Sequence, residues 1–189
     1  MTAPDPNSAF RRVPELRTQR LLLRQFRPED LDDIWDYASD PRTTMHTIWD
    51  THRSLDDTRA FLASALARQS AGGPPHWAIQ ELEGTGLIGT CGFVNLAPEH
   101  LRGEIGYVLS PKFWGRGYGT EAARAIIAYG FTELRLNRIE ARCATENAAS
   151  ARVLEKAGMR FEGLLRRDIV VRGMPRDARL YAVLRQNWE

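Results

Sequence analysis

The chain has 189 residues, of which 43% are hydrophobic and 26% are charged, and its net charge at neutral pH is +2. These values are ordinary for one globular domain, and so small a net charge gives no reason to expect nucleic acid or a membrane surface as a partner. The sequence has no run approaching the ~20 apolar residues of a membrane span. Its N-terminus also lacks the apolar region of a signal peptide, so we expect a cytoplasmic protein.

The first part of the chain is expected to hold a flexible arm, a strand and two helices. Residues 1–15 contain three prolines and should form the arm, which leaves residues 16–189 as a single domain. Ser54 can cap a helix, because its side chain can accept from the backbone N–H three residues later. The expected elements are a strand at 20–25, a helix from Pro28 to Asp40, a loop at 42–53 and a helix at 54–70.

The remainder of the chain alternates strand patterns with helix patterns. Residues 76–82 and 87–96 are strand-like and are joined by E-G-T-G, which predicts a hairpin. Ile105, Tyr107 and Leu109 alternate with smaller or polar residues and predict the next strand. The later elements are expected to be a helix from about Thr120 to Leu134, a strand at 138–143, a helix capped by Asn147 and ended by Gly158, and strands at 161–171 and 177–184 joined by R-G-M-P-R.

The two cysteines, Cys91 and Cys143, have neither a metal-ligand spacing nor a disulfide pattern. Both fall in strand-like runs, so we expect two buried, small hydrophobic side chains, with a reactive thiol as the alternative. The sequence predicts no metal site.

A glycine loop follows the strand that ends at Leu109. Gly115, Gly117 and Gly119 occupy every second position, and a helix pattern begins directly after them. Such a backbone can curl tightly, and the unsatisfied N–H groups of a helix N-terminus favour a phosphate. The loop runs G-x-G-x-G, so it is neither a Walker loop nor the dinucleotide fingerprint. For the glycines alone, a tight turn without a ligand is an equal alternative.

The segment P-K-F-W-G-R-G-Y-G-T-E-A, at residues 111–122, closely resembles the pyrophosphate-binding loop of the GCN5-related N-acetyltransferases (GNATs). The family pattern is Q/R-x-x-G-x-G/A. Trp114 at its first position departs from that pattern but is similar to the branch that includes the RimJ/RimL ribosomal-protein acetyltransferases. The resemblance covers roughly residues 16–186 and is strongest at residues 103–123 and 145–163. It implies an α+β (mixed α/β) GNAT fold, with a mostly antiparallel, splayed sheet of about seven strands flanked by about four helices.

The same resemblance implies which residues bind acetyl-CoA as co-substrate. N–H groups of the loop would bind its pyrophosphate, and Asn147 matches an asparagine that hydrogen-bonds the pantetheine arm. A backbone N–H near Tyr107 or Val108 would polarise the thioester carbonyl. The expected cofactor-binding residues are Val108, Leu109, Trp114, Gly115, Arg116, Gly117, Tyr118, Gly119, Thr120, Asn147 and Arg152.

The resemblance also implies catalytic roles. Glu104 matches the carboxylate that accepts the proton of the amine through water. The family tyrosine that protonates the leaving thiolate would fall at Leu154, so this acid is missing and Ser150 is its nearest substitute. The plain alternatives are an exposed strand residue for Glu104, a helix cap alone for Asn147, a solvent-facing side chain for Ser150 and a surface charge for Arg152. The alternative bases are His46, His52, His76 and His100.

The sequence therefore predicts an acetyl-CoA-dependent N-acetyltransferase in which a primary amine attacks directly in a ternary complex. The first expected acceptor is a protein N-terminal α-amine, and the second is a small amine such as a polyamine, an aminoglycoside or an amino acid. Acceptor contacts are expected from residues 42–53, 96–102 and 172–176. A non-catalytic acyl-CoA-binding regulator and a nucleotide-binding module unrelated to CoA are the remaining alternatives. The protein is expected to be a monomer or a homodimer.

Overall fold

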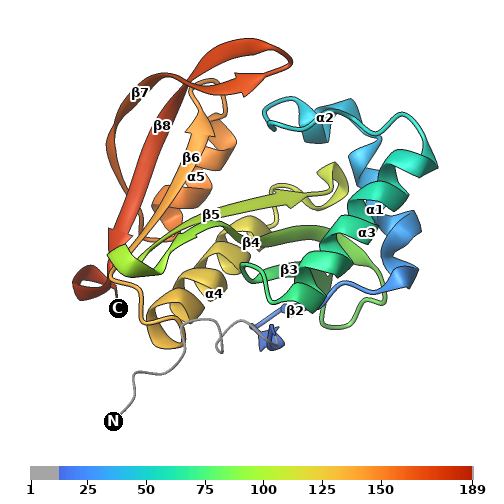
Figure 1. Ribbon diagram of the computed structural model, residues 1–189, viewed down its shortest axis with the longest axis horizontal. Coiled ribbons are helices and arrows are strands. Elements are labelled where there is room, and N and C mark those ends of the chain that lie inside the picture. The colour runs from blue at the N-terminus through green and yellow to red at the C-terminus, as the bar shows by residue number, and fades with distance from the viewer. Residues whose placement is uncertain (1–12, 189) are drawn as a thin grey trace.

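The computed structural model describes residues 13–188, which form one eight-stranded sheet with the strand order β1-β2-β3-β4-β5-β6-β8-β7 (Figure 1). Every neighbouring pair is antiparallel except β5 and β6. The strands are β1 (Leu16–Arg17), β2 (Leu21–Arg24), β3 (His76–Glu81), β4 (Leu87–Ala97), β5 (Arg102–Leu109), β6 (Arg138–Ala144), β7 (Arg160–Val171) and β8 (Met174–Leu184).

Five α-helices accompany this sheet within the described part of the chain: α1 (Leu31–Ala38), α2 (Pro41–Thr44), α3 (Leu55–Ala71), α4 (Tyr118–Thr132) and α5 (Ala148–Lys156). The expected mixed α+β fold with a mostly antiparallel sheet is confirmed. The structure has one strand and one helix more than the sequence predicted. The expected arm falls largely on residues 1–12, which lie outside the described residues.

The additional elements are short. β1 has two residues, too few for an alternating pattern to be visible in the sequence. α2 begins at the Asp40-Pro41 pair that was expected only to end the preceding helix. Pro41 takes the first helical position, where it loses no hydrogen bond, and the Asp40 side chain accepts from the N–H of Arg42 at 2.9 Å. The prediction of a loop over 42–53 was therefore wrong at its start.

The β7–β8 connection is tighter than expected, because β8 begins at Met174 and leaves only Arg172 and Gly173 between the strands. Both residues have positive φ angles, 50° and 74°. A two-residue turn of this kind matches the right-handed twist of a hairpin. The hairpin extends beyond the rest of the sheet (Figure 1).

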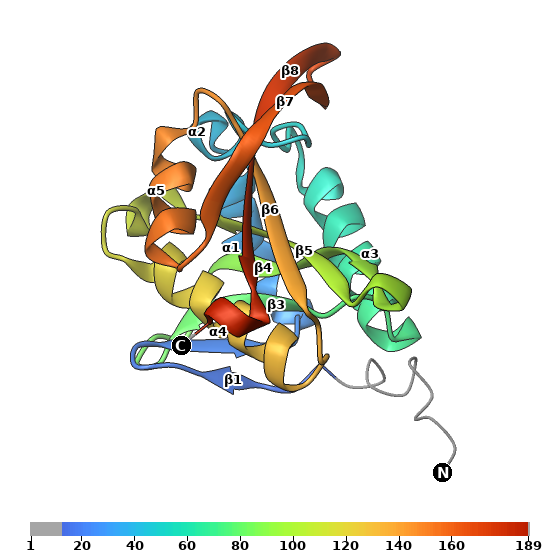
Figure 2. The ribbon, with the colours of Figure 1, turned by 90° about the vertical axis from the view of Figure 1, so that its left-hand side faces the viewer.

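Two apolar cores cover the two faces of the sheet. Helices α4 and α5 pack against one face, around buried residues that include Ile126, Ile139 and Leu154. Helices α1 and α3 pack against the other face, around Ile34 and Leu62. Figure 2 shows α5 and α3 on opposite sides of the sheet. Cys91 and Cys143 are both buried, as expected of small hydrophobic side chains.

The chain is already packed before β1 begins. Val13 is buried in the core, and the carbonyl oxygen of Pro14 accepts a hydrogen bond of 2.7 Å from the Trp77 indole N–H. Residues 13 and 14 thus differ from the loose arm that the sequence suggested for them.

The sheet splits between its two parallel strands. β5 and β6 pair at only three positions, from Arg102 with Arg138 to Glu104 with Glu140. From Ile105 onward the edge of β5 that faces β6 has no partner strand. Helices α4 and α5 follow β5 and β6, so their N-termini lie at the carboxyl ends of the separated strands. Ligands of sheets with parallel strands generally bind at such a point.

Candidate active site

The glycine loop leaves a group of backbone donors unused. Gly115 and Gly117 have φ angles of 75° and 84°, and α4 begins directly after them. Within residues 13–188, no N–H group from Gly115 to Thr120 donates to a backbone carbonyl, and the first such bond of the helix comes from Glu121 to Gly117 at 3.1 Å. A Cβ at Gly115 would meet open space. The loop therefore combines free N–H groups, a helix N-terminus and room for an anion.

A clamp from the β1–β2 turn holds the loop in place. The Arg20 guanidinium donates to Glu121 Oε2 at 2.8 Å and to the carbonyl oxygen of Arg116 at 2.9 Å, and it lies over the Tyr118 ring. Thr18 Oγ1 also donates to Glu121 at 2.6 Å. Sequence reasoning missed this clamp, because no local pattern pairs an arginine with a glutamate about a hundred positions away.

The start of α5 lies across the split from β5. Asn147 caps this helix, since its Oδ1 accepts from the N–H of Ser150 at 3.0 Å. The Ser150 hydroxyl lies 2.9 Å from the Tyr107 hydroxyl, which also lies 3.2 Å from the Ser150 carbonyl oxygen. Burial raises the pKa of Tyr107, so this phenol stays protonated at neutral pH. The sequence singled out only the backbone of Tyr107, and its side chain proves to be the partner of Ser150.

Glu104 lies in an ionic network on the opposite side of β5. Its carboxylate contacts the guanidinium of Arg142, which also reaches Asp168 at 3.0 Å and Glu140 at 3.7 Å. The hydrogen bond to Glu104 is the main reason why the pKa of Arg142 is raised. Glu104, the predicted base, is thus a partly buried carboxylate that is paired with a cation.

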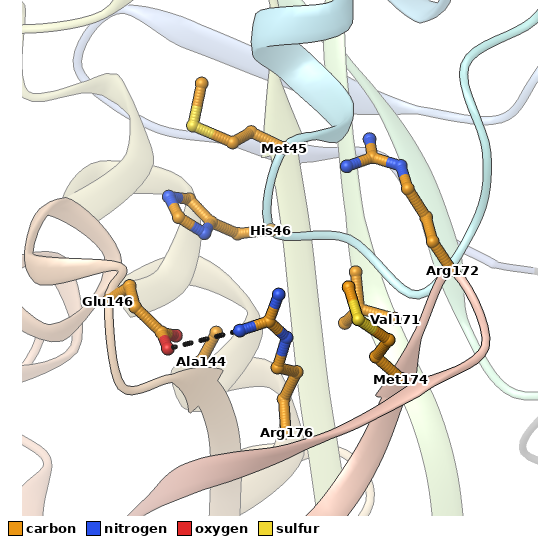
Figure 3. Close-up of a pocket in the computed structure, with 8 residues that line it drawn as sticks. All are labelled: Met45, His46, Ala144, Glu146, Val171, Arg172, Met174 and Arg176. Atoms are coloured by element: carbon orange, nitrogen blue, oxygen red, sulfur yellow. Dashed lines mark ion pairs between the residues drawn. The ribbon is translucent and has the colours of Figure 1, made fainter.

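A cavity of about 260 Å³ lies beyond the carboxyl end of β6, between the segment after α2 and the β7–β8 hairpin (Figure 3). Ala144 and Val171 contribute to its walls. Its remaining lining residues carry longer side chains: Met45, His46, Glu146, Arg172, Met174 and Arg176.

Two of the three segments expected to contact the acceptor meet in this cavity. Residues 42–53 supply Met45 and His46, and residues 172–176 supply the hairpin side chains. The third segment, residues 96–102, lies elsewhere. It precedes β5, and the carbonyl of Leu101 accepts from the N–H groups of Asn137 and Arg138 at the start of β6, whereas the cavity lies at the end of β6.

The other predicted cofactor residues lie around the loop and the split. Val108 and Leu109 end β5, and the Trp114 indole N–H donates to the Leu109 carbonyl at 2.8 Å. The Tyr118 hydroxyl donates to Glu81 at 2.5 Å. Arg116 lies over the Phe113 ring, and Arg152 is exposed on α5.

The histidines are scattered. His76 stacks on Phe26, and burial lowers its pKa to about 4, while His52 lies 2.9 Å from the Thr58 hydroxyl. His100 lies in the turn before β5, at the far end from the cavity. Of the four histidines, only His46 lines the cavity.

Comparison with known proteins shows the family to which this chain belongs. Residues 20–160 match the family model described as an acetyltransferase (GNAT) domain. The chain belongs to the GNAT acetyltransferase family. It is 34% identical over 172 residues to the uncharacterized N-acetyltransferase YoaA of Bacillus subtilis, covering 91% of this chain and 97% of that protein.

Solved structures agree with this assignment. A GNAT-family acetyltransferase from Bacillus anthracis is 33% identical to this acetyltransferase and superimposes with a TM-score of 0.81, over 92% of this chain and 99% of that one. The ribosomal L7/L12 α-N-protein acetyltransferase RimL, solved with coenzyme A, has a TM-score of 0.79 over 90% and 98% of the two chains but only 18% identity, so it supports the fold alone. As a GNAT, the enzyme uses acetyl-CoA.

No helix in residues 13–188 has both the length and the apolar character needed to cross a bilayer. Across the same residues, no group of histidine, cysteine and acidic side chains is arranged to hold a metal ion.

Proposed function

We propose that this acetyltransferase transfers the acetyl group of acetyl-CoA to the α-amine at a protein N-terminus, by direct attack in a ternary complex. The observation that carries the proposal is the set of unused N–H groups from Gly115 to Thr120, which adjoins the split between β5 and β6. The loop can bind the pyrophosphate, with Arg116 as a nearby cation. The unpaired edge of β5 and the amide group of Asn147 can bind the pantetheine arm.

The thioester then reacts at the unpaired part of β5. As the amine nitrogen bonds to the carbonyl carbon, a backbone N–H near Tyr107 or Val108 stabilises the negative charge on the oxygen. One such donor generally contributes ~10²–10³ in rate. The carbon–sulfur bond then breaks, and the departing thiolate takes a proton from the Ser150 hydroxyl. The buried phenol of Tyr107, 2.9 Å from Ser150, can replace that proton.

The amine must lose a proton to attack. Glu104 accepts it through water, and its contact with Arg142 fixes the position of the carboxylate. An α-amine has a reference pKa of about 8, whereas a lysine amine has one of about 10.4. A larger fraction of an α-amine is therefore already neutral at pH 7. The proposed base, Glu104, is paired with the Arg142 guanidinium. An acceptor that is already partly neutral suits such a site, and an N-terminal α-amine is an acceptor of this kind.

A small amine is the second candidate acceptor, and one observation favours it. The cavity of about 260 Å³ is close to the size of a single small molecule. One relative, a spermidine N(1)-acetyltransferase of Escherichia coli, is 33% identical over 79 residues, or 42% of each chain.

The test is a comparison of acceptors at saturating acetyl-CoA, with release of free CoA measured by a thiol reagent. We expect turnover with short peptides that have a free N-terminus, and none with the same peptides blocked at the N-terminus. Turnover confined to polyamines, aminoglycosides or free amino acids would contradict the N-terminal acceptor while leaving the acetyltransferase intact.

A further inference from the structure

We infer that the acceptor carries a carboxylate close to its reactive amine, and that Arg172 and Arg176 bind this carboxylate. The inference rests on the proposed function in one respect, namely that the cavity after β6 receives the acceptor. It adds a substrate class to that function: an amine with a short aliphatic stem and an acidic group.

The charges around the cavity support an anion. The lining includes two guanidinium groups, one carboxylate and one imidazole (Figure 3). Arg176 and Glu146 are 3.9 Å apart, whereas the tight pair between Arg24 and Asp30 elsewhere in the chain is 2.6 Å apart. Glu146 therefore holds Arg176 only loosely, and most donors of this guanidinium remain available to a ligand.

Arg172 is not neutralised at all within residues 13–188. Its guanidinium contacts the carbonyl oxygen of Thr44 at 3.2 Å and the hydroxyl of the same residue at 3.4 Å, and it forms no ion pair there. These neutral acceptors fix the side chain in position without cancelling its charge. A planar guanidinium held in this way is suited to a carboxylate, which it can bind through two parallel hydrogen bonds.

The rest of the lining matches a short aliphatic stem. Met45 and Met174 are each 53% exposed although they are large and apolar, and both face this cavity. Methionine adapts its shape to different apolar groups. A polyamine fits poorly here, because the described lining has two guanidinium groups and a single carboxylate, that of Glu146.

The cavity also lies near the expected reaction centre. Its lining includes Ala144 at the end of β6 and Glu146, which immediately precedes Asn147, the residue expected to hold the pantetheine arm. An acceptor bound to the hairpin arginines would therefore have its amine within reach of the thioester. Two sources share this chemistry: a protein N-terminus with an acidic residue near its start, and a free acidic amino acid.

The first experiment measures kcat/KM for matched acceptors with the wild-type enzyme. The peptides Ala-Glu-Ala-Ala and Ala-Gln-Ala-Ala differ only in charge, and free glutamate and spermidine complete the set. We expect the Glu peptide to exceed the Gln peptide by roughly 10- to 100-fold, as a charged hydrogen bond generally contributes. Equal values for the two peptides, or a preference for spermidine, would overturn the inference.

The second experiment tests the arginines. Arg176→Ala and Arg172→Ala should raise KM for the Glu peptide with little change in kcat, and should leave the Gln peptide nearly unaffected. Arg160→Ala, which removes an exposed arginine at the start of β7, is the matched control and should change neither value. An unchanged Glu-to-Gln ratio in both arginine variants would contradict the assignment.

The two proposals can fail separately. Turnover of free glutamate without turnover of peptides would refute the N-terminal acceptor and keep the carboxylate. Turnover of peptides without a preference for the Glu peptide would refute the carboxylate and keep the N-terminal acceptor. Calorimetry of the CoA-loaded enzyme with succinate and with spermidine gives a readout independent of turnover. We expect succinate to bind more tightly and Arg176→Ala to abolish its binding, and tighter binding of spermidine would overturn the inference.

Discussion

The two halves of the proposed active site, one proposed for the cofactor and one for the acceptor, are built in different ways. The cofactor half comes from two continuous segments, residues 103–123 and 145–158, and it offers mainly backbone groups. The acceptor half comes from three short segments around Met45, Ala144 and the β7–β8 turn, and it offers side chains. A constant ligand can be recognised by a fixed backbone geometry. An acceptor that differs between enzymes is recognised by side chains on connecting segments, which can change without disturbing the fold.

The two halves should respond differently to substitution. Changes in the cofactor half should alter CoA affinity or the chemical step whatever the acceptor, and changes in the acceptor cavity should alter acceptor preference at constant CoA affinity.

The largest effect is expected from Gly117→Val. The φ angle of 84° is unfavourable for valine, and a Cβ there would lie 3.3 Å from the Arg20 guanidinium. We expect CoA affinity, measured by calorimetry, to fall by about 100-fold or more as the N–H groups lose their common direction. Gly72→Val, with a φ angle of 72° at the end of α3, is the control for backbone strain alone. Unchanged CoA affinity in Gly117→Val would remove the loop from the site.

Glu104→Gln should separate chemistry from binding. We expect kcat to fall by roughly 10²-fold, as is usual when a general base is lost, while CoA affinity stays nearly constant. Glu162→Gln is a suitable control, because Glu162 pairs with Arg138 at 2.6 Å in the neighbouring part of the same network. A normal pH–rate profile in Glu104→Gln would dismiss the base assignment and direct attention to His46.

Arg20→Ala should leave the glycine loop less ordered before CoA binds. This substitution removes the bonds to Glu121 and to the Arg116 carbonyl, so the loop must be ordered when CoA binds. We expect CoA affinity to fall by about 10-fold, with the acceptor preference unchanged. Arg17→Ala alters an exposed arginine on β1 and should have no effect. Wild-type affinity in Arg20→Ala would mean that the clamp is unnecessary for CoA binding.

Tyr107→Phe should have the smallest effect. It removes the hydroxyl 2.9 Å from Ser150 and keeps the ring in place. We expect kcat to fall by a few-fold, less than in Ser150→Ala, with CoA affinity preserved, because a rearranged water can partly replace the phenol. Tyr129→Phe alters another buried tyrosine and controls for packing. A larger loss in Tyr107→Phe than in Ser150→Ala would make Tyr107 itself the proton donor.

Particular elements show where sequence reasoning succeeded. The N-cap of α3 is formed as predicted, because the Ser54 side chain accepts from the backbone N–H of Asp57, three residues later. The strand, glycine loop and helix around Gly117 also follow from local chemistry. The cofactor contacts assigned to these residues stay predictions. β1 and α2 were missed because elements of two and four residues carry too little pattern.

The sequence by itself determined the mixed fold, the course of the chain from strand through glycine loop to helix, and the residues expected to bind acetyl-CoA. The fold and the course of the chain depend on alternation, capping and glycine spacing among neighbours, and the acetyl-CoA residues depend on the resemblance of residues 111–122 and 145–163 to the GNAT family. Only the tertiary structure decided that Arg20 holds the loop, that Arg142 pairs with Glu104, that Tyr107 meets Ser150, and that two hairpin arginines face His46 across a cavity. These contacts join segments far apart in the sequence, and they form only when the sheet and its two layers of helices bring those segments together.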